Sequence, residues 1–515
     1  MNQPARVVRV SSGPVGIVAE PLPSTESQPR TTRNNPDRTA WAHVGLAYGS
    51  LLLLSVGSVL LIGAGRVRDQ SYWGDEAVTA AIVRRPLIGF LRVLWSQEAG
   101  MGPYYAALWM WSRAFGGDAG LRMFSVIGVA IAAAFAFDLA WRWFGAAEAV
   151  AVSTIMVVHP FALRYLVEAR AYSWMMALGV GLVWVIDRWR QSPTTAWTAT
   201  VGVVAGLLVS THIAAIPFVV AVLIAVIATT STEVWWTRRS LIIVGVTTAL
   251  FALSVPALLA REGQIDWIAP VSPTNLLEIV ERLYGEGWWA AFIGVGVLLL
   301  ALGASRASRW QRVALLAATL LAPALVALVS IVQSLWIPRY LAPTLPLAVV
   351  AAVAGISGLG RRIAAHGPGA RYTAGGASAV IAIAAIGSLV IAGPFQDSSE
   401  YRDGMHSAVA HITEQLQPGD LVLASDQEHM PLYHYLGVRS DLVPSLLTLP
   451  DDDLLYPVEA EVNEIQDRLR AAPRVFVVRN SARPIDPDIT ATFAGWKHQS
   501  RRFGRVAIEI YSRPS

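Results

Sequence analysis

Apolar stretches of about 20 residues recur along most of this chain, and they constrain its fold more than any other feature. A helix of that length crosses a hydrocarbon layer about 30 Å thick. The chain has 54% hydrophobic and only 15% charged residues, whereas in soluble proteins about a quarter of the residues are charged. The sequence therefore predicts an all-α polytopic membrane domain.

We predict about 11 spanning helices, each about 20 residues long. They lie near 41–64, 121–143, 147–163, 171–187, 194–211, 213–230, 240–260, 288–304, 312–332, 340–358 and 376–394. The segment 103–115 is apolar and aromatic, but its 13 residues are too few to span, so we assign it to the interface. Arginine clusters then fall in the cytoplasmic loops, as the positive-inside rule requires, and the first loop, 65–120, lies outside.

Composition divides the chain into three parts. Residues 1–40 are polar and lack the apolar core of a signal peptide, so we interpret them as a disordered cytoplasmic tail. Residues 41–394 form the transmembrane domain, and 395–515 have the composition of a small extracytoplasmic α/β domain. Within that domain we predict a helix at 403–416, strands at 421–425, 474–478 and 505–511, and a solvated acidic loop at 451–453.

Residue usage also limits the kind of protein this is. No cysteine is present, which excludes a disulfide framework and a thiolate metal site. The net charge of +4 is carried by arginine, and the chain is rich in alanine, valine, glycine and tryptophan. We interpret this bias as that of a high-GC bacterium such as an actinobacterium. We expect the plasma membrane as location, membrane lipid as a partner and no nucleic-acid partner.

The first external loop begins with two adjacent carboxylates, Asp75 and Glu76, after Tyr72 and Trp73. The loop continues through an amphipathic aromatic segment suited to the membrane surface. We expect this segment to fold back beside the two acids and form a pocket. The alternative without a catalytic role is that both acids are ordinary solvated loop residues.

Two further external turns carry arginine close to the predicted membrane surface. Arg170 follows Glu168 between the third and fourth predicted spans, and Arg339 precedes Tyr340 after a very short turn. Guanidinium groups suit bidentate binding of phosphate. Arg339 could instead anchor its helix to lipid headgroups, and His212, just past a span end, could be purely structural. We also expect Asp138, inside the second span, to pair with Arg142 one turn later.

The ordered set GDEA, RYLVEARAYS, STHIAAIPF and IPRYLAPTLP resembles the C-type (GT-C) membrane glycosyltransferase superfamily over residues 60–350. It is most similar to the branch of polyprenyl-phosphate-mannose protein mannosyltransferases, family 39-like bacterial glycosyltransferases and lipid A aminoarabinose transferases. The resemblance implies a polyprenyl-phosphate sugar donor, inversion at the anomeric carbon and catalysis at the acid pair of the first loop. The family often has His-Pro-Pro before the interfacial helix, where this chain has Met-Gly-Pro at 101–103. We expect Glu98 or Gln97 to occupy the space of that histidine.

On this resemblance, each candidate residue receives a role. We expect Asp75 to be the general base, with Glu76 and Glu168 holding acceptor or sugar hydroxyls. The donor phosphate is assigned to Arg339 first, and then to Arg170, His212 and Tyr340. Acceptor or substrate contacts are expected from Tyr72, Trp73, Glu98, Tyr104 and Tyr172, although the tryptophans also suit an interface belt. A monophosphate donor requires no cofactor, and Mg²⁺ or Ca²⁺ between Asp75 and Glu168 stays open.

Several alternatives remain at this point. Mannose is the expected sugar, arabinofuranose is the second candidate, and the acceptor is an envelope glycan, a lipoglycan or a protein hydroxyl. A lipid-linked glycan transporter or flippase would place ionisable residues at mid-membrane in broken helices, whereas here they gather at one face. A non-catalytic scaffold of envelope assembly is the third class. Substitution of Asp75 separates the three, because a scaffold should tolerate it.

Overall fold

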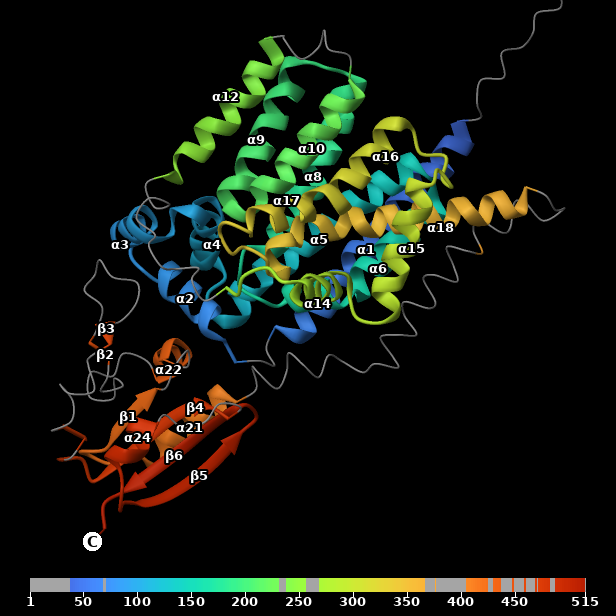
Figure 1. Ribbon diagram of the computed structural model, residues 1–515. Helices are drawn as coiled ribbons and strands as arrows, with labels where there is room; N and C mark the ends of the chain where they lie inside the picture. The colour runs from blue at the N-terminus through green and yellow to red at the C-terminus, as the bar shows by residue number, and fades with distance from the viewer. Residues whose placement is uncertain are drawn as a thin grey trace, which may run out of the picture. The chain divides into compact units, whose positions relative to one another are not determined.

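The computed structural model is mostly helical, and the strands that it describes form a four-stranded and a two-stranded sheet near the C-terminus (Figure 1). It describes residues 38–67, 71–230, 238–255, 268–365, 376, 404–424, 429–436, 447–448, 458–459, 468–469, 471–481 and 487–514. The chain divides into two compact units, 1–47 and 48–515, and everything below concerns the second unit except the start of the first helix.

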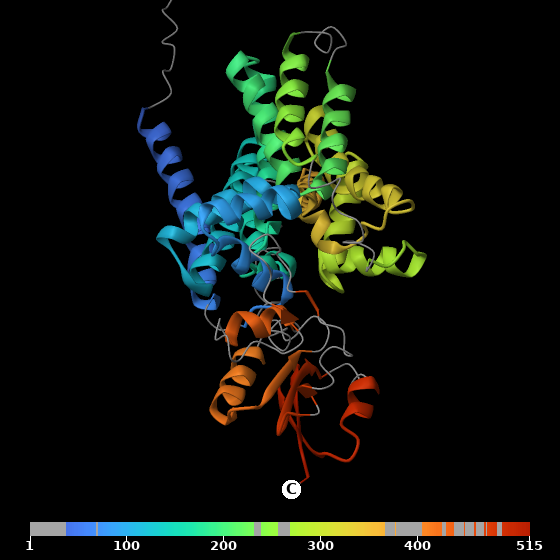
Figure 2. The ribbon, with the colours of Figure 1, turned by 90° about the vertical axis from the view of Figure 1, so that its left-hand side faces the viewer.

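The helical part begins with long α1 and a group of short helices, which precede the long α5. Its first elements are α1 Arg38–Arg66, α2 Gly74–Val83, α3 Leu87–Val93, the π-helical turn η1 Leu94–Glu98, η2 Ala99–Met101, α4 Gly102–Ala114, α5 Gly117–Trp143, α6 Ala146–Val158 and α7 Pro160–Leu166. The next are α8 Tyr172–Gln191, α9 Thr195–Thr211, η3 Ile213–Ala215, α10 Ile216–Thr229, α12 Arg238–Ala252, α14 Pro273–Tyr284 and α15 Trp288–Ala301. The last are α16 Arg309–Leu316, η4 Ala317–Leu321, α17 Ala322–Val329, η5 Pro338–Thr344 and α18 Leu345–Ala364. Helices α9, α10 and α12 lie side by side (Figures 1 and 2).

Four of the described helices are long and apolar enough to cross a membrane, or six if each of two bent pairs counts as one span. Ten of the predicted spans coincide with helical segments of the structure. The segment 103–115, which we expected to be too short to span, corresponds to the short helix α4. The predicted span at 376–394 lies outside the described residues, apart from residue 376. The fold is therefore a polytopic helical membrane fold, while the count of 11 stays a prediction.

The third predicted span is broken by proline. Helices α6 and α7 meet at an angle of 58° at His159 and Pro160. Proline cannot donate to the preceding turn, so the helix restarts, and the Nδ1 atom of His159 accepts the Phe161 N–H at 3.2 Å as its N-cap. The short α7 leads into residues 167–171, the turn that contains Glu168 and Arg170.

Small residues let two of the helices approach closely. A Cβ on Gly296 of α15 would lie 2.4 Å from the Cα of Ala352, and one on Gly355 of α18 would lie 1.9 Å from the Gly296 carbonyl oxygen. Such contacts between small residues are the usual way in which helices pack in a membrane. Helix α18 is thereby fixed against α15, and η5 is fixed at its start.

The C-terminal region contains a four-stranded sheet in the order β1-β4-β6-β5. Its strands are β1 Leu421–Ala424, β4 Arg474–Asn480, β5 Lys497–Phe503 and β6 Val506–Ser512, and β2 Leu447–Thr448 pairs separately with β3 Val458–Glu459. Strand β1 is parallel to β4, and the other pairs are antiparallel, with Val477 opposite Glu509. Helices α21 Met405–Gln415, α22 His429–Leu436 and α24 Pro487–Thr492 complete this region.

The sequence located most of these elements. The expected helix at 403–416 is α21, and the three expected strands are β1, β4 and β6. Strand β5 was missed because its polar sequence shows no apolar alternation, and its conformation depends on pairing with β6. Helix α14 was missed inside the loop 261–287, although Ser272 and Asn275 form a capping box at its start. The acidic run at 451–453 lies outside the described residues.

Asp138, the buried carboxylate of the second predicted span, has the arginine partner that we expected. Asp138 accepts the Arg142 Nε–H at 2.5 Å, and it also contacts Tyr48, Trp184 and Arg188. The predicted pairing of Asp138 with Arg142 is confirmed. The four donors explain how a carboxylate is retained within an apolar helix.

Candidate functional site

Asp75 lies in the first turn of α2, the helix that opens the first loop. Trp73 is extended and Gly74 begins the helix, so the Asp75 carboxylate stands near the helix N-terminus, where negative charge is favoured. About a third of its side chain (32%) is exposed, which leaves room for a substrate. Asp75 is therefore accessible as well as held by a rigid element.

Two arginines from distant parts of the chain converge on this carboxylate. The Oδ2 atom of Asp75 lies 3.7 Å from Nη2 of Arg170 and 3.9 Å from Nη1 of Arg339. Both separations exceed the roughly 2.8 Å of a charge-assisted hydrogen bond. The turn after α7 and the 3-10 turn η5 thus each bring an arginine to the N-terminus of α2.

Arg170 is fixed by partners on neighbouring helices. Its Nη1 donates to the hydroxyl of Tyr105 at 2.9 Å and lies 3.4 Å from Oγ1 of Thr79. Thr79 stands one turn after Asp75 on α2 and donates to the Asp75 carbonyl oxygen at 3.0 Å. Tyr105 and Thr79 were not among the residues expected from the sequence. Only the adjacency of Tyr105 to Tyr104 in the aromatic segment pointed toward it.

Arg339 is enclosed by aromatic rings. Its guanidinium carbon lies 5.6 Å from the ring centre of Trp73 and 5.9 Å from that of Tyr172, within the range of cation–π attraction. The approach of η5 to α8 depends on Gly179, where a Cβ would lie 2.7 Å from Pro343. The aromatic contacts and the absence of a side chain at Gly179 together define where this guanidinium sits.

His212 and Tyr340 lie at the edge of the same cluster. Their ring centres are 4.6 Å apart, and the His212 ring is 6.0 Å from that of Tyr172. The Nδ1 atom of His212 accepts the Ala214 N–H at 3.2 Å, so the proton of a neutral ring is on Nε2. His212 therefore caps a helical turn through Nδ1 and still offers Nε2–H as a donor. A structural role and a role in phosphate binding do not exclude each other here.

Glu98, Tyr104 and Glu168 are buried near Arg170. Arg170 interacts electrostatically with Glu98, and Tyr104 interacts with Glu168. Burial raises the pKa of Tyr104 well above its usual value, so this phenol stays protonated. Glu98 ends the π-helical turn η1, an irregularity that often marks functional positions.

Glu76 departs from its expected role. Its side chain is fully buried, and both oxygens accept from Arg122, Oε1 from Nε and Oε2 from Nη2, each at 2.9 Å. Oε1 also accepts the backbone N–H of Ala169 at 2.9 Å. The geometry therefore does not support the expectation that Glu76 holds acceptor or sugar hydroxyls. Instead, this ion pair fixes α2 to α5 and to the turn that carries Arg170.

The Tyr72 side chain is also engaged within the protein. Its hydroxyl donates to the Asp118 carbonyl oxygen at 3.1 Å, and the Arg122 guanidinium lies 4.7 Å from its ring centre. The expected acceptor contact of Tyr72 is therefore not supported. Arg122 was missed by the sequence analysis, although an arginine near the end of a predicted span was a signal for it.

A divalent cation at Asp75 would need several oxygen ligands. Among the residues that the structure describes, no three histidine, aspartate or glutamate side chains come together as a metal site. Both guanidinium groups lie within 4 Å of Oδ2 of Asp75, so Arg170 and Arg339 supply positive charge beside this carboxylate. We therefore derive no step through a metal, and Mg²⁺ or Ca²⁺ between Asp75 and Glu168 stays an open expectation.

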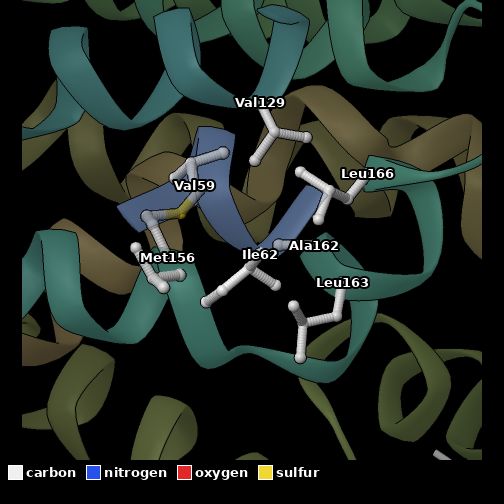
Figure 3. Close-up of a pocket in the computed structure, with 8 residues that line it drawn as sticks. Val59, Ile62, Val129, Met156, Ala162, Leu163 and Leu166 are labelled. Carbon is white, nitrogen blue, oxygen red and sulfur yellow. The ribbon is translucent and has the colours of Figure 1, made fainter. Parts of the chain in front are cut away.

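A small apolar pocket, separate from this cluster, lies between α1, α5, α6 and α7 (Figure 3). Its lining residues are Val59, Ile62, Val129, Met156, Val157, Ala162, Leu163 and Leu166. Hydrocarbon walls provide no partner for a phosphate or a sugar hydroxyl. We assign this pocket no part in the chemistry.

No protein-family model and no curated protein sequence matches this chain. Solved structures do match. ArnT from Cupriavidus metallidurans in the apo state has a TM-score of 0.59 at 13% identity, covering 92% of this chain and 98% of that one. The same ArnT bound to undecaprenyl phosphate gives 0.57 at 14% identity, again covering 92% and 98%.

A third match comes from an archaeon. The oligosaccharyltransferase AglB from Archaeoglobus fulgidus, in complex with an inhibitory peptide and a dolichol-phosphate, has a TM-score of 0.52 at 11% identity. It covers 93% of this chain and 75% of that one. At such low identity these similarities define the fold. The chain therefore has the fold of the C-type (GT-C) membrane glycosyltransferases, as its sequence resemblance predicted.

Proposed function

We propose that this protein is an inverting glycosyltransferase that moves a sugar, mannose first, from a polyprenyl phosphate to an envelope acceptor outside the membrane. The observation that carries the proposal is the accessible Asp75 carboxylate between Arg170 and Arg339. A general base and two phosphate-binding cations are the groups that such a transfer needs. The fold supports the same class of reaction, since ArnT was solved with undecaprenyl phosphate and AglB with dolichol-phosphate.

In the proposed mechanism, Asp75 takes the proton of the acceptor hydroxyl. The freed oxygen attacks the anomeric carbon from the face opposite the phosphate, so the configuration inverts as the carbon–phosphate oxygen bond breaks. The helix N-terminus holds Asp75 in a fixed orientation for this attack. The departing polyprenyl phosphate carries the negative charge that develops in the transition state.

Arg339 and Arg170 would stabilise that phosphate. Guanidinium groups bind two phosphate oxygens at once, and here the neighbouring rings and hydroxyls fix the orientation of both. His212 adds its Nε2–H donor at the edge of the cluster, beside Tyr340. We expect Trp73 and Tyr172, whose rings lie beside the Arg339 guanidinium, to contact the sugar or the lipid phosphate.

The identity of the sugar rests on the sequence resemblance to the mannosyltransferase branch. The direct test uses purified protein in proteoliposomes with an envelope extract as acceptor. We expect label to move from polyprenyl-phosphate mannose to the extract, with inverted configuration in the product. Transfer from polyprenyl-phosphate arabinofuranose alone would replace mannose by the second candidate. Movement of labelled lipid across the bilayer without transfer would instead support a flippase.

The Arg339→Lys variant tests the phosphate assignment. Lysine keeps the charge but loses the planar fork and its stacking between two rings. We expect the donor KM to rise about tenfold, the effect of losing roughly one hydrogen bond to a charged group. The measurement is initial rate against donor concentration.

Arg164→Lys is the matched control for this variant, since Arg164 is an exposed arginine of the α7 segment. Its donor KM should not change. If correctly inserted Arg339→Lys protein has the donor KM of the wild type, Arg339 is a headgroup anchor and Arg170 takes the phosphate role.

Membrane orientation has its own test, because the cysteine-free chain permits single labelling sites. Ser96 and Ser500 are exposed and predicted outside, whereas Arg306 is exposed and predicted in the cytoplasm. In intact cells, an impermeant thiol reagent should label Ser96→Cys and Ser500→Cys, and should label Arg306→Cys only after permeabilisation. The reverse pattern would invert the orientation and contradict an external active site.

A further inference from the structure

The segment that leads into α2 is held by the C-terminal region. The backbone N–H of Tyr72 donates to the hydroxyl oxygen of Tyr435 on α22 at 2.7 Å. The backbone N–H of His406, at the start of α21, donates to Oγ of Ser71 at 3.0 Å. Two consecutive residues just before α2 are therefore bound by groups more than 300 positions later in the chain.

His434 bridges two helices of the first loop. Its Nδ1 lies 3.3 Å from Nη1 of Arg84 at the end of α2, and its Nε2 lies 3.1 Å from Oδ1 of Asp118 at the start of α5. A guanidinium group can only donate, so Nδ1 accepts from Arg84, and Nε2–H donates to the Asp118 carboxylate. The neutral ring thus fits between a cation and a carboxylate, which also contact each other at 3.3 Å.

Apolar contacts strengthen the same attachment. Met430 of α22 is buried in one cluster with Ala77 and Ile82 of α2 and with Tyr105 of α4. The Tyr72 and His434 rings have their centres 4.8 Å apart. Helix α22 is therefore packed on the helix that bears the proposed base.

The attachment leads directly to the candidate site. Tyr72 precedes Asp75 by three residues, and the Ser71 carbonyl oxygen accepts from Arg122, the partner of Glu76. Few bonds separate the anchored segment from the carboxylate, so a displacement at Tyr72 would move Asp75 relative to Arg170 and Arg339. Errors of about 1 Å in the position of a reacting group can reduce rates up to a hundredfold.

We infer that His406, His434 and Tyr435, here called the C-terminal clamp, are positioning residues that hold Asp75 in its working orientation. This inference rests on the proposed function, because it gives the clamp a role in that reaction. The proposed mechanism gives the clamp no contact with donor or acceptor. Its loss should therefore slow turnover while donor binding, which depends on Arg170 and Arg339, is kept.

The principal variant is Tyr435→Phe, which removes the oxygen that accepts the Tyr72 N–H and little else. We expect kcat to fall about tenfold, as misplacement of a base would cause, with the donor KM within about twofold of the wild type. Tyr433→Phe removes the hydroxyl oxygen of another tyrosine on α22. It should leave kcat and the donor KM unchanged.

A rescue series on His434 separates positioning from simple loss of packing. His434→Ala should lower kcat, whereas His434→Gln supplies one acceptor for Arg84 and one donor for Asp118 and should recover most of it. Equal losses in the two variants would contradict the bridging role.

Hydrogen–deuterium exchange gives a readout that does not depend on activity. In full-length Tyr435→Phe protein, amides of residues 71–83 should exchange faster than in the wild type, while those of α15 and α18 do not change. If wild-type protein transfers no sugar, the proposed function fails, and faster exchange would still support the clamp. If the wild type is active and Tyr435→Phe matches it in kcat and in exchange, the clamp is wrong and the proposed function stands.

Discussion

Asp75→Asn is expected to lower the rate of sugar transfer at least about a hundredfold, because general bases contribute roughly that much or more. Asparagine keeps the size and the hydrogen-bonding capacity of the side chain but cannot take the acceptor proton. Donor binding should persist, and the donor KM should stay equal or fall, since one negative charge beside Arg170 and Arg339 is removed. Steady-state rates with saturating donor and acceptor provide the measurement.

The control is Asp451→Asn, the same change in an acidic run that the sequence predicts to be a solvated loop. It should have little effect. Near-normal turnover in Asp75→Asn protein would remove Asp75 from the mechanism. Suspicion would then move to Glu98 and Glu168, because the two oxygens of Glu76 are already bound by Arg122 and Ala169.

The helical part of the fold was largely predictable because it depends on local properties. The length of the apolar stretches predicted ten segments that are helical in the structure. The short length of 103–115 distinguished α4 from the predicted spans. The break at His159 and Pro160 follows from the chemistry of proline, yet its angle of 58° depends on packing. Strand β5 was missed since its conformation comes from pairing with β6.

The candidate site was predictable as a set of positions but not as a set of contacts. Asp75, Arg170 and Arg339 were each singled out at external turns, and the structure brings both arginines within 4 Å of the Asp75 carboxylate. The sequence analysis assigned Asp75 as the base but also placed Glu76 at the substrate, whereas the structure pairs Glu76 with Arg122. Consecutive residues in the first turn of a helix point in different directions, so one faces solvent and the other faces Arg122.

The clamp could not be seen in the sequence at all. Tyr435 and His434 lie in a stretch without apolar periodicity or a motif, and their partners Tyr72 and Asp118 are over 300 residues away. Side-chain pairs at such separations are set by the tertiary fold, and a single sequence carries no trace of them. The same holds for Arg122, whose partner Glu76 is 46 residues distant.

Glu76→Gln is expected to destabilise the protein strongly. The pair of Glu76 and Arg122 is almost completely buried, with exposed side-chain fractions of 0% and 1%. Arginine cannot lose its proton in a protein, so the variant would leave a buried charge without its counter-ion. Breaking such a pair lowers the free energy of unfolding by about 3–5 kcal/mol. Thermal unfolding in detergent would register this as a large fall in the midpoint or as a failure to purify.

Two comparisons make that result specific to the buried pair. Glu278→Gln removes one partner of an ion pair on α14 whose side chains are 55% and 58% exposed, and it should change the stability by less than about 0.5 kcal/mol. The double variant Glu76→Gln/Arg122→Met removes both charges and should be more stable than Glu76→Gln alone. If the double variant is less stable than the single one, the loss comes from packing and backbone contacts rather than from removal of the Glu76 charge. In that case the ion pair would not be what fixes α2 beside the turn of Arg170.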